Sequence, residues 1–244
     1  MRLRLLALLL ALAIGASTAA AQEGIQLSWN DCGTFGSGVQ TFACNSNSGT
    51  AFRMIGSARL NATLDPLVTI ISTLDVSVDA TSLPAWWQVH NAGACRQSAV
   101  AASVHVPGPG ACAAWENNTT LDAFMVQDGY GGPSHTRWDV LQFGDANNPV
   151  AFPGGVENFL FSISINRSRT VGAGSCSGCP LAACVTLRRV EFRYGSFPTG
   201  TETVKVVTTP LTSFGITWQS VAPSCLGAVP APRATWSDVK ALYR

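Results

Sequence analysis

Apolar residues recur at every second position along most of this chain. The clearest run contains Phe159, Phe161, Ile163 and Ile165, with Ser162 among the residues between them. Because successive side chains of a strand point to opposite faces, this spacing predicts a strand with one buried face. The same period predicts strands within residues 25–29, 52–58, 74–78, 121–127, 137–143, 184–194, 203–208 and 214–219.

Turn-forming residues separate these segments, and they set the fold class. Clusters rich in Gly, Pro and Asn lie between the predicted strands, for example at residues 33–38, 129–133 and 172–180. About ten short strands divided in this way predict an all-β fold. We expect a two-sheet antiparallel β-sandwich, jelly-roll-like, with disulfides and a short C-terminal helix.

Two irregularities interrupt the pattern. The apolar phase changes at Arg188 and Arg189, which predicts a β-bulge there. The segment between Pro84 and Trp115 shows the weakest period. We interpret it as a long loop held by Cys95 and Cys112.

The first 21 residues have the three parts of a secretory signal peptide. They begin with Arg2 and Arg4, continue with an apolar run over residues 5–14, and end in small residues up to Ala21. Crossing a bilayer takes about 20 apolar residues, so the run is too short for an anchor. We expect cleavage before Gln22, no membrane span afterwards, and a protein that is secreted, periplasmic or at the cell surface.

Charge narrows the range of partners. The formal net charge is +1, and loss of the two signal arginines makes it −1. Only 12% of residues are charged. A nearly neutral chain lacks the Lys and Arg excess of a nucleic-acid or anionic-membrane binder, so no nucleic-acid partner is predicted.

The C-terminus differs from the rest of the chain. We divide the mature protein into a β-sandwich domain (22–226), a Pro-rich linker (227–234) and a tail (235–244). In the tail Trp236, Val239 and Tyr243 fall on one face of a predicted amphipathic helix. Such a short helix is marginal alone. Either it docks on its own domain, or it is a recognition tag for export, surface attachment or a partner.

The tail from Trp236 to Arg244 and the segment from Ser28 to Gly33 carry a resemblance. Together they resemble uncharacterised exported bacterial proteins that pair a β domain with a short C-terminal W-x-x-V-K-x-L-Y-R tail. The resemblance covers these two ends and, loosely, the Cys-rich stretch 176–184. It implies an envelope or secreted setting in a bacterium and brings no known activity.

Cysteines predict a disulfide framework. An even number behind a signal peptide is typical of disulfides in an oxidising compartment. Proximity favours Cys32 with Cys44 and Cys95 with Cys112, and leaves the other four open. The eight cysteines are Cys32, Cys44, Cys95, Cys112, Cys176, Cys179, Cys184 and Cys225.

The Cys-Ser-Gly-Cys motif at residues 176–179 has two functional alternatives, a zinc site and a redox pair. No His lies nearby in sequence to complete a zinc site, and the surrounding Gly and Pro residues indicate a loop. Structural disulfides are therefore favoured.

Candidate binding residues are aromatic or acidic. Trp86, Trp87, Trp115 and Tyr130 fall in or beside loops. Exposed rings at such places suit sugar stacking or protein contacts, so they are the predicted ligand platform.

Asp145 and Asn147 resemble part of a calcium loop. The Gly and the acidic residue of a complete loop are missing, so calcium is only a possible cofactor and no other is predicted.

No catalytic residues are assigned. The chain has no G-x-S-x-G nucleophile motif. Asp75 and Asp79 would lie about 13 Å apart along a strand, too far for a glycosidase pair. The leading hypothesis is a non-catalytic binding or assembly protein of the bacterial envelope or extracellular space, with a protein or glycan partner. The alternatives are a carbohydrate-binding module or glycan-active hydrolase, and a self-assembling subunit of a surface fibre.

Overall fold

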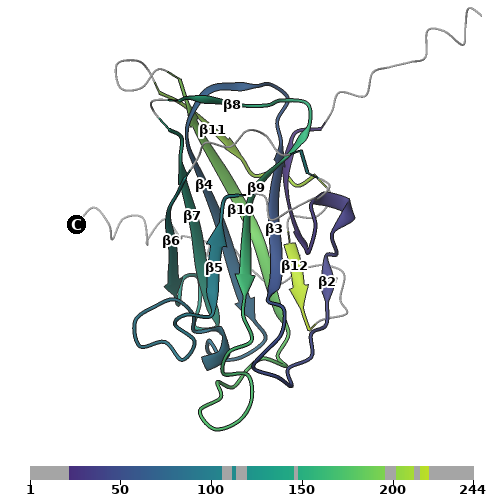
Figure 1. Cartoon of the computed structure of the whole chain (residues 1–244), viewed down its shortest axis with the longest axis vertical. Helices are drawn as coiled ribbons and strands as arrows, with labels where there is room; N and C mark the ends of the chain where they lie inside the picture. Colours follow the sequence, from purple (N-terminus) through teal and green to yellow (C-terminus); the bar gives the residue numbers. More distant parts are fainter. Residues whose placement is uncertain are drawn as a thin grey trace, which may run out of the picture.

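The computed structural model describes residues 22–105, 112–113, 120–145, 148–195, 202–211 and 215–219. The predicted signal peptide, Trp115, Asn147, Cys225, the linker and the C-terminal tail lie outside these residues. The regular secondary structure of the described part is almost entirely β-strand, arranged as two sheets (Figure 1). No helix in it is long and apolar enough to cross a membrane.

The smaller sheet has four antiparallel strands in the order β1-β3-β9-β5. Their bounds are Gly24–Trp29, Phe52–Arg59, Glu157–Ile165 and Val100–Ser103, respectively.

The larger sheet follows the order β2-β12-β10-β4-β7-β6. Strand β11 adds to β10 and β8 adds to β4, and only β2 and β12 pair in parallel. The bounds are β2 Val39–Gln40, β4 Leu64–Val78, β6 Thr120–Asp128, β7 His135–Phe143, β8 Val150–Phe152, β10 Ala183–Tyr194, β11 Thr203–Val207 and β12 Gly215–Trp218. Two 3₁₀ helices, η1 (Gly33–Phe35) and η2 (Ala85–Trp87), lie in the connections.

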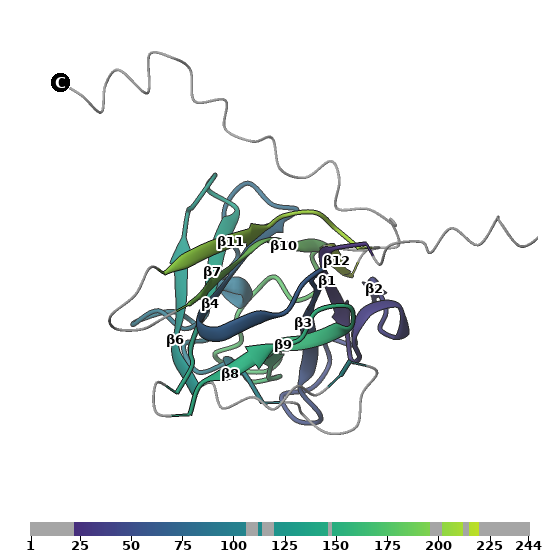
Figure 2. The same ribbon diagram turned by 90° about the horizontal axis from the view of Figure 1, so that it is seen from above.

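The main hydrophobic core takes side chains from both sheets. Leu27 and Ile163 enter it from the small sheet, and Leu74, Trp138 and Leu187 enter it from the large one. Figure 2, seen from above, shows β10 and β11 of the large sheet on the opposite side of the molecule from β9 of the small sheet. Burial alternates along β7, as the two-residue period predicts for a strand with one face in a core.

The two sheets are joined at the β1 edge. The backbone N–H of Ile25 donates to the carbonyl of Thr209 at 2.9 Å, and Leu211 N–H donates back to Ile25 at 3.1 Å. Nearby, the Lys205 ammonium on β11 lies 2.9 Å from the Glu23 carboxylate. The first strand of the small sheet is therefore tied to the segment between β11 and β12 of the large sheet.

The bulge predicted at Arg188 is confirmed. Leu187 pairs with Leu74 and Arg189 pairs with Thr73, so Arg188 is an extra residue on β10. An extra residue is what changes the phase of the apolar pattern along this strand.

A second bulge contradicts the prediction that Phe159 shares a face with Phe161. Phe159 pairs with Ser57 while Phe161 pairs with Gly56, so Leu160 is extra. Phe159 packs in a separate small cluster with Ile55, whereas Phe161 lies in the main core. A Cβ on Gly56 would lie 2.3 Å from the Phe161 ring, so glycine makes room for that ring.

The predicted long loop between Pro84 and Trp115 is only partly a loop. Its described part contains η2 and β5, and β5 adds an edge strand to the small sheet. The period was weak because β5 has only four residues, of which one is buried.

The cysteines form disulfides, but the pairs favoured by proximity are wrong. The described bonds join Cys32 to Cys112, Cys44 to Cys179 and Cys95 to Cys176. Their sequence separations are 80, 135 and 81 residues. Cys184 is disulfide-bonded as well. Because sheet pairing brings distant segments together, nearness in sequence did not decide the partners.

Candidate ligand-binding site

The face of the large sheet that points away from the core carries the candidate site. On β4 the core takes Ile70, Leu74 and Val76, so the residues between them point outward. We call this surface the outer sheet face. It is formed by Thr69, Ile71, Thr73 and Asp75 of β4, Arg137, Asp139, Leu141 and Phe143 of β7, Met125 of β6, and Arg188, Arg189, Glu191 and Arg193 of β10.

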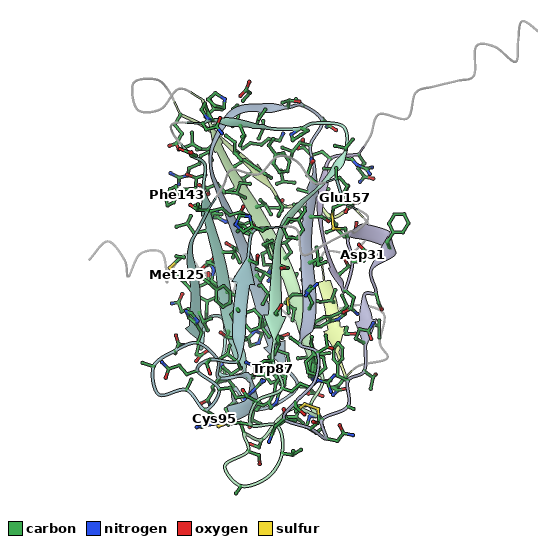
Figure 3. The ribbon with its side chains drawn as sticks, in the orientation of Figure 1. Asp31, Trp87, Cys95, Met125, Phe143 and Glu157 are labelled. Atoms are coloured by element: carbon green, nitrogen blue, oxygen red, sulfur yellow. A yellow bond between two sulfur atoms is a disulfide. The ribbon has the colours of Figure 1, made fainter. Side chains whose placement is uncertain are left out.

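Exposed apolar side chains flank this face. Met125 and Phe143 lie on the same side of the molecule, well away from Asp31 and Glu157 of the small-sheet side (Figure 3). Phe143 is 41% exposed, so much of this residue is in contact with solvent. An aromatic residue at a strand end in this state is available to a ligand.

A pocket of about 540 Å³ lies where β7 and β10 end, and we call it the end pocket. Thr69 pairs with both Phe143 and Arg193, so these three residues form one row at its base. The volume lies in the range of small-molecule sites. The lining consists of Pro66, Leu67, Val68, Thr69, Phe143, Gly144, Asp145, Pro149, Arg193, Gly195 and Glu202.

Arg193 is the positively charged residue of this lining, and acidic neighbours hold it. Its guanidinium lies 2.8 Å from the Glu191 carboxylate, which is outside the pocket. On the other side Glu202 lies at 3.7 Å, a looser contact. The short pair with Glu191 fixes the guanidinium plane, which prepares Arg193 to donate to a ligand without first becoming ordered.

A row of ion pairs continues from the end pocket across the outer sheet face. Arg188 Nε lies 2.6 Å from Asp75, and Arg189 lies 3.3 Å from Glu191. Thr73 donates its hydroxyl to Asp139 at 2.7 Å. The polar residues of this face are therefore held in place by one another.

The predicted platform of Trp86 and Trp87 is wrong, because both side chains are fully buried. They lie on the 3₁₀ helix η2, which turns both side chains inward. Both pack against Trp218, with ring centroids 4.9 and 5.6 Å away. The two tryptophans are part of the core.

Tyr130 is exposed, as predicted, in the turn before β7. The Arg137 guanidinium lies 4.5 Å from the centre of its ring. It stands at the opposite end of β7 from Phe143, so it does not line the end pocket.

The two metal predictions have different outcomes. Cys176 and Cys179 are each bonded to a distant cysteine, so the zinc and redox alternatives for the C-x-x-C motif are wrong. Asp145 lines the end pocket and accepts a backbone hydrogen bond from Asn148 at 3.1 Å through its carbonyl. Within the described ranges no three His, Cys, Asp or Glu residues gather as metal ligands, and calcium stays a prediction.

Sequence reasoning did not find Thr69, Phe143, Arg193 or Glu202. Each is an ordinary strand or turn residue in its own segment, and only sheet pairing brings them together. The chain matches no model of a known protein family, and a search of curated proteins likewise gave no match.

Proposed function

We propose that this chain is an exported, non-catalytic binding protein that recognises a glycan in the end pocket. One observation supports this proposal above the others: the exposed ring of Phe143 shares a single pocket with the held guanidinium of Arg193 and the carboxylates of Asp145 and Glu202.

A sugar ring has two kinds of surface, and the end pocket offers a partner for each. The C–H groups of a sugar form an apolar patch that packs on an aromatic ring such as Phe143. Its neighbouring hydroxyls match the paired oxygens of a carboxylate and the paired N–H groups of a guanidinium. Asp145, Glu202 and Arg193 supply these groups beside Phe143.

The scaffold suits work outside the cytoplasm. Disulfides persist in oxidising compartments, and the described ones link segments far apart in sequence. We interpret the two facing sheets as a sandwich of the jelly-roll type, which presents loops and strand ends as binding sites while its core stays rigid. The predicted signal peptide and the resemblance to exported bacterial proteins support the same setting.

Binding of the mature protein to an immobilised glycan panel, followed by calorimetry on the strongest ligand, tests the proposal. Phe143→Ala should weaken binding about tenfold, because it removes the stacking surface. Phe35→Ala is the matched control, since Phe35 is 77% exposed on η1 beside the other sheet. Equal affinity of the two variants, or no glycan bound by the wild type, would contradict the proposal.

The two carboxylates in the end pocket also favour the alternative of a glycan-active hydrolase. A glycosidase places an acid and a second carboxylate on either side of the bond that it cleaves. Reducing ends released from a bound glycan, and lost in Glu202→Gln or Asp145→Asn, would establish the hydrolase. We expect no release from the wild type.

A free strand edge favours the third alternative, self-assembly. Strand β6 pairs with β7 and with no other strand of the described part. Its residues 123–127 carry no charge, and Met125 is exposed. Unprotected edges of this kind pair with other strands. Light scattering over a concentration series separates this alternative: assembly predicts a rising mass that Met125→Lys abolishes, whereas a constant monomer mass excludes it.

A further inference from the structure

The bulge on β10 turns two consecutive arginines to the same side of the sheet. In a regular strand one of Arg188 and Arg189 would point into the core. Here Arg188 bonds Asp75 and Arg189 bonds Glu191, and both acids belong to the outer sheet face. The bulge therefore places two guanidinium groups side by side on one surface.

Most donors of these two groups have no hydrogen-bond partner among the described residues. A guanidinium has five N–H donors. In the described part Arg188 uses Nε toward Asp75, and Arg189 uses one Nη toward Glu191. The Nε of Arg189 is buried and has no hydrogen-bond partner there. The Nη groups left unpaired in the described part belong to partly exposed side chains, so they are available to a ligand that brings acceptor oxygens.

The two acidic side chains of these ion pairs are more deeply buried than the two arginine side chains. The side chain of Asp75 is 15% exposed and that of Glu191 is 10% exposed. The side chains of Arg188 and Arg189 are 37% and 43% exposed. Although the charges balance in number, an approaching molecule meets the guanidinium groups first.

The arginine pair is continuous with the end pocket. Arg189 and Arg193 lie on the same face of β10, four residues and thus about 13 Å apart. Glu191 stands between them and contacts both. A chain molecule with one unit in the end pocket would run along this face and pass over Arg189 and Arg188.

From this arrangement we propose that the glycan is acidic, and that Arg188 and Arg189 bind the carboxylate or sulfate groups of its chain. The inference rests on the proposed glycan binding at the end pocket. Planar guanidinium groups bind such oxyanions with paired hydrogen bonds, which explains why arginines rather than lysines stand here. The nearly neutral chain supplies little long-range attraction, so the preference comes from these local contacts.

Pairs of polymers that differ only in their acidic groups show whether binding depends on charge or on the sugar alone. Polygalacturonate is compared with its fully methyl-esterified form, and dextran sulfate with dextran, at about 50 and about 300 mM NaCl. The pair that binds identifies carboxylate or sulfate as the group recognised. The wild type should bind the acidic member at least tenfold more tightly than the neutral one at low salt. High salt should reduce the difference.

Two double variants test the residues. Arg188→Gln with Arg189→Gln should remove the preference for the acidic member and leave binding of the neutral member unchanged. Arg188→Lys with Arg189→Lys keeps the charge beside Asp75 and Glu191, so it controls for folding and should retain part of the preference. Arg167→Gln with Arg169→Gln is the control, because both arginines make solvent-exposed hydrogen bonds in the 166–171 segment. This double variant should leave the affinity for every polymer unchanged.

The outcomes distinguish the inference from the proposed function. Neutral-glycan binding that needs Phe143 but shows no acidic preference, or a preference that survives the Gln variant, overturns the inference alone. If the wild type binds none of the four polymers and no other glycan, both proposals fail.

Discussion

Arg96 links Trp86 of the core to the segment that follows β9 through hydrogen bonds. Its replacement tests how much these buried contacts stabilise the fold. The residue is 2% exposed. Its Nε donates to the carbonyl of Ser168 at 2.9 Å, Nη1 donates to Trp86 at 3.1 Å, and Nη2 donates to Asn166. The guanidinium also lies 3.7 Å from the centre of the Trp86 ring.

Burial lowers the pKa of Arg96 to about 10, so the side chain is still charged at neutral pH. Carbonyl oxygens and the Trp86 ring, rather than a carboxylate, are the partners of this charge in the described part. Arg96→Met keeps an apolar stem of similar length but leaves three carbonyls without their donor. At about 1 to 3 kcal/mol for each buried group left unsatisfied, and with partial relaxation, we expect a loss of about 3 to 5 kcal/mol in the free energy of unfolding.

Urea unfolding followed by tryptophan fluorescence measures this loss. Arg167→Met is the matched control, because Arg167 also donates to a carbonyl, that of Thr50 at 3.1 Å, and also lies over a ring. Its hydrogen bond is exposed, so the loss should stay below about 1 kcal/mol. A change at Arg96 no larger than that at Arg167 would refute the reasoning.

Two further predictions concern the links between distant segments. Replacing Cys95 and Cys176 with serine opens a loop of 81 residues, and chemical unfolding should show a loss of about 4 kcal/mol; unaltered stability would contradict the link. Burial alone would raise the pKa of Glu23, but hydrogen bonds from Lys205 and from the Asn61 backbone outweigh it, so the pKa lies below its ordinary value of 4.5. The pair therefore stabilises the fold above that pH and loses its effect as the pH falls below it. Lys205→Met should lower the free energy of unfolding by about 1 kcal/mol or less at pH 7 and by nothing near pH 2. A loss of stability that grows on acidification would contradict this prediction.

Local patterns predicted the strands well. The two-residue period located β1, β3, β7, β9 and β10, and the change of phase at Arg188 and Arg189 predicted the bulge that lies at Arg188. These features depend on which neighbours in sequence face the core, and that information is present in each segment. Short strands such as β5 offered too few residues for a period to be recognised.

Contacts between distant segments were not predictable in the same way. Cys44 bonds Cys179 across 135 residues because the segment after β2 lies beside the loop before β10, and no local pattern records that meeting. Trp86 and Trp87 were predicted to be exposed because their segment has no period. Their burial follows from Trp218, which comes from another part of the chain.

The candidate site also depends on contacts between distant segments. Phe143 lies at the end of a strand that the sequence predicts, but nothing near it in sequence marks a pocket. Arg193 becomes a pocket residue because Thr69 pairs with it on one side and with Phe143 on the other. The strand that carries a ligand-binding residue can thus be predicted, whereas its neighbours in the site depend on sheet order.

The most direct measurement is an amide and side-chain chemical-shift titration of the labelled mature protein with the tightest-binding oligosaccharide. Glycan recognition at the end pocket predicts that the largest shifts belong to Thr69, Phe143, Arg193 and Glu202, and that the Phe143 ring protons transfer magnetisation to sugar C–H protons. Shifts centred on the turn at Tyr130, or on η1 at Phe35, would contradict it.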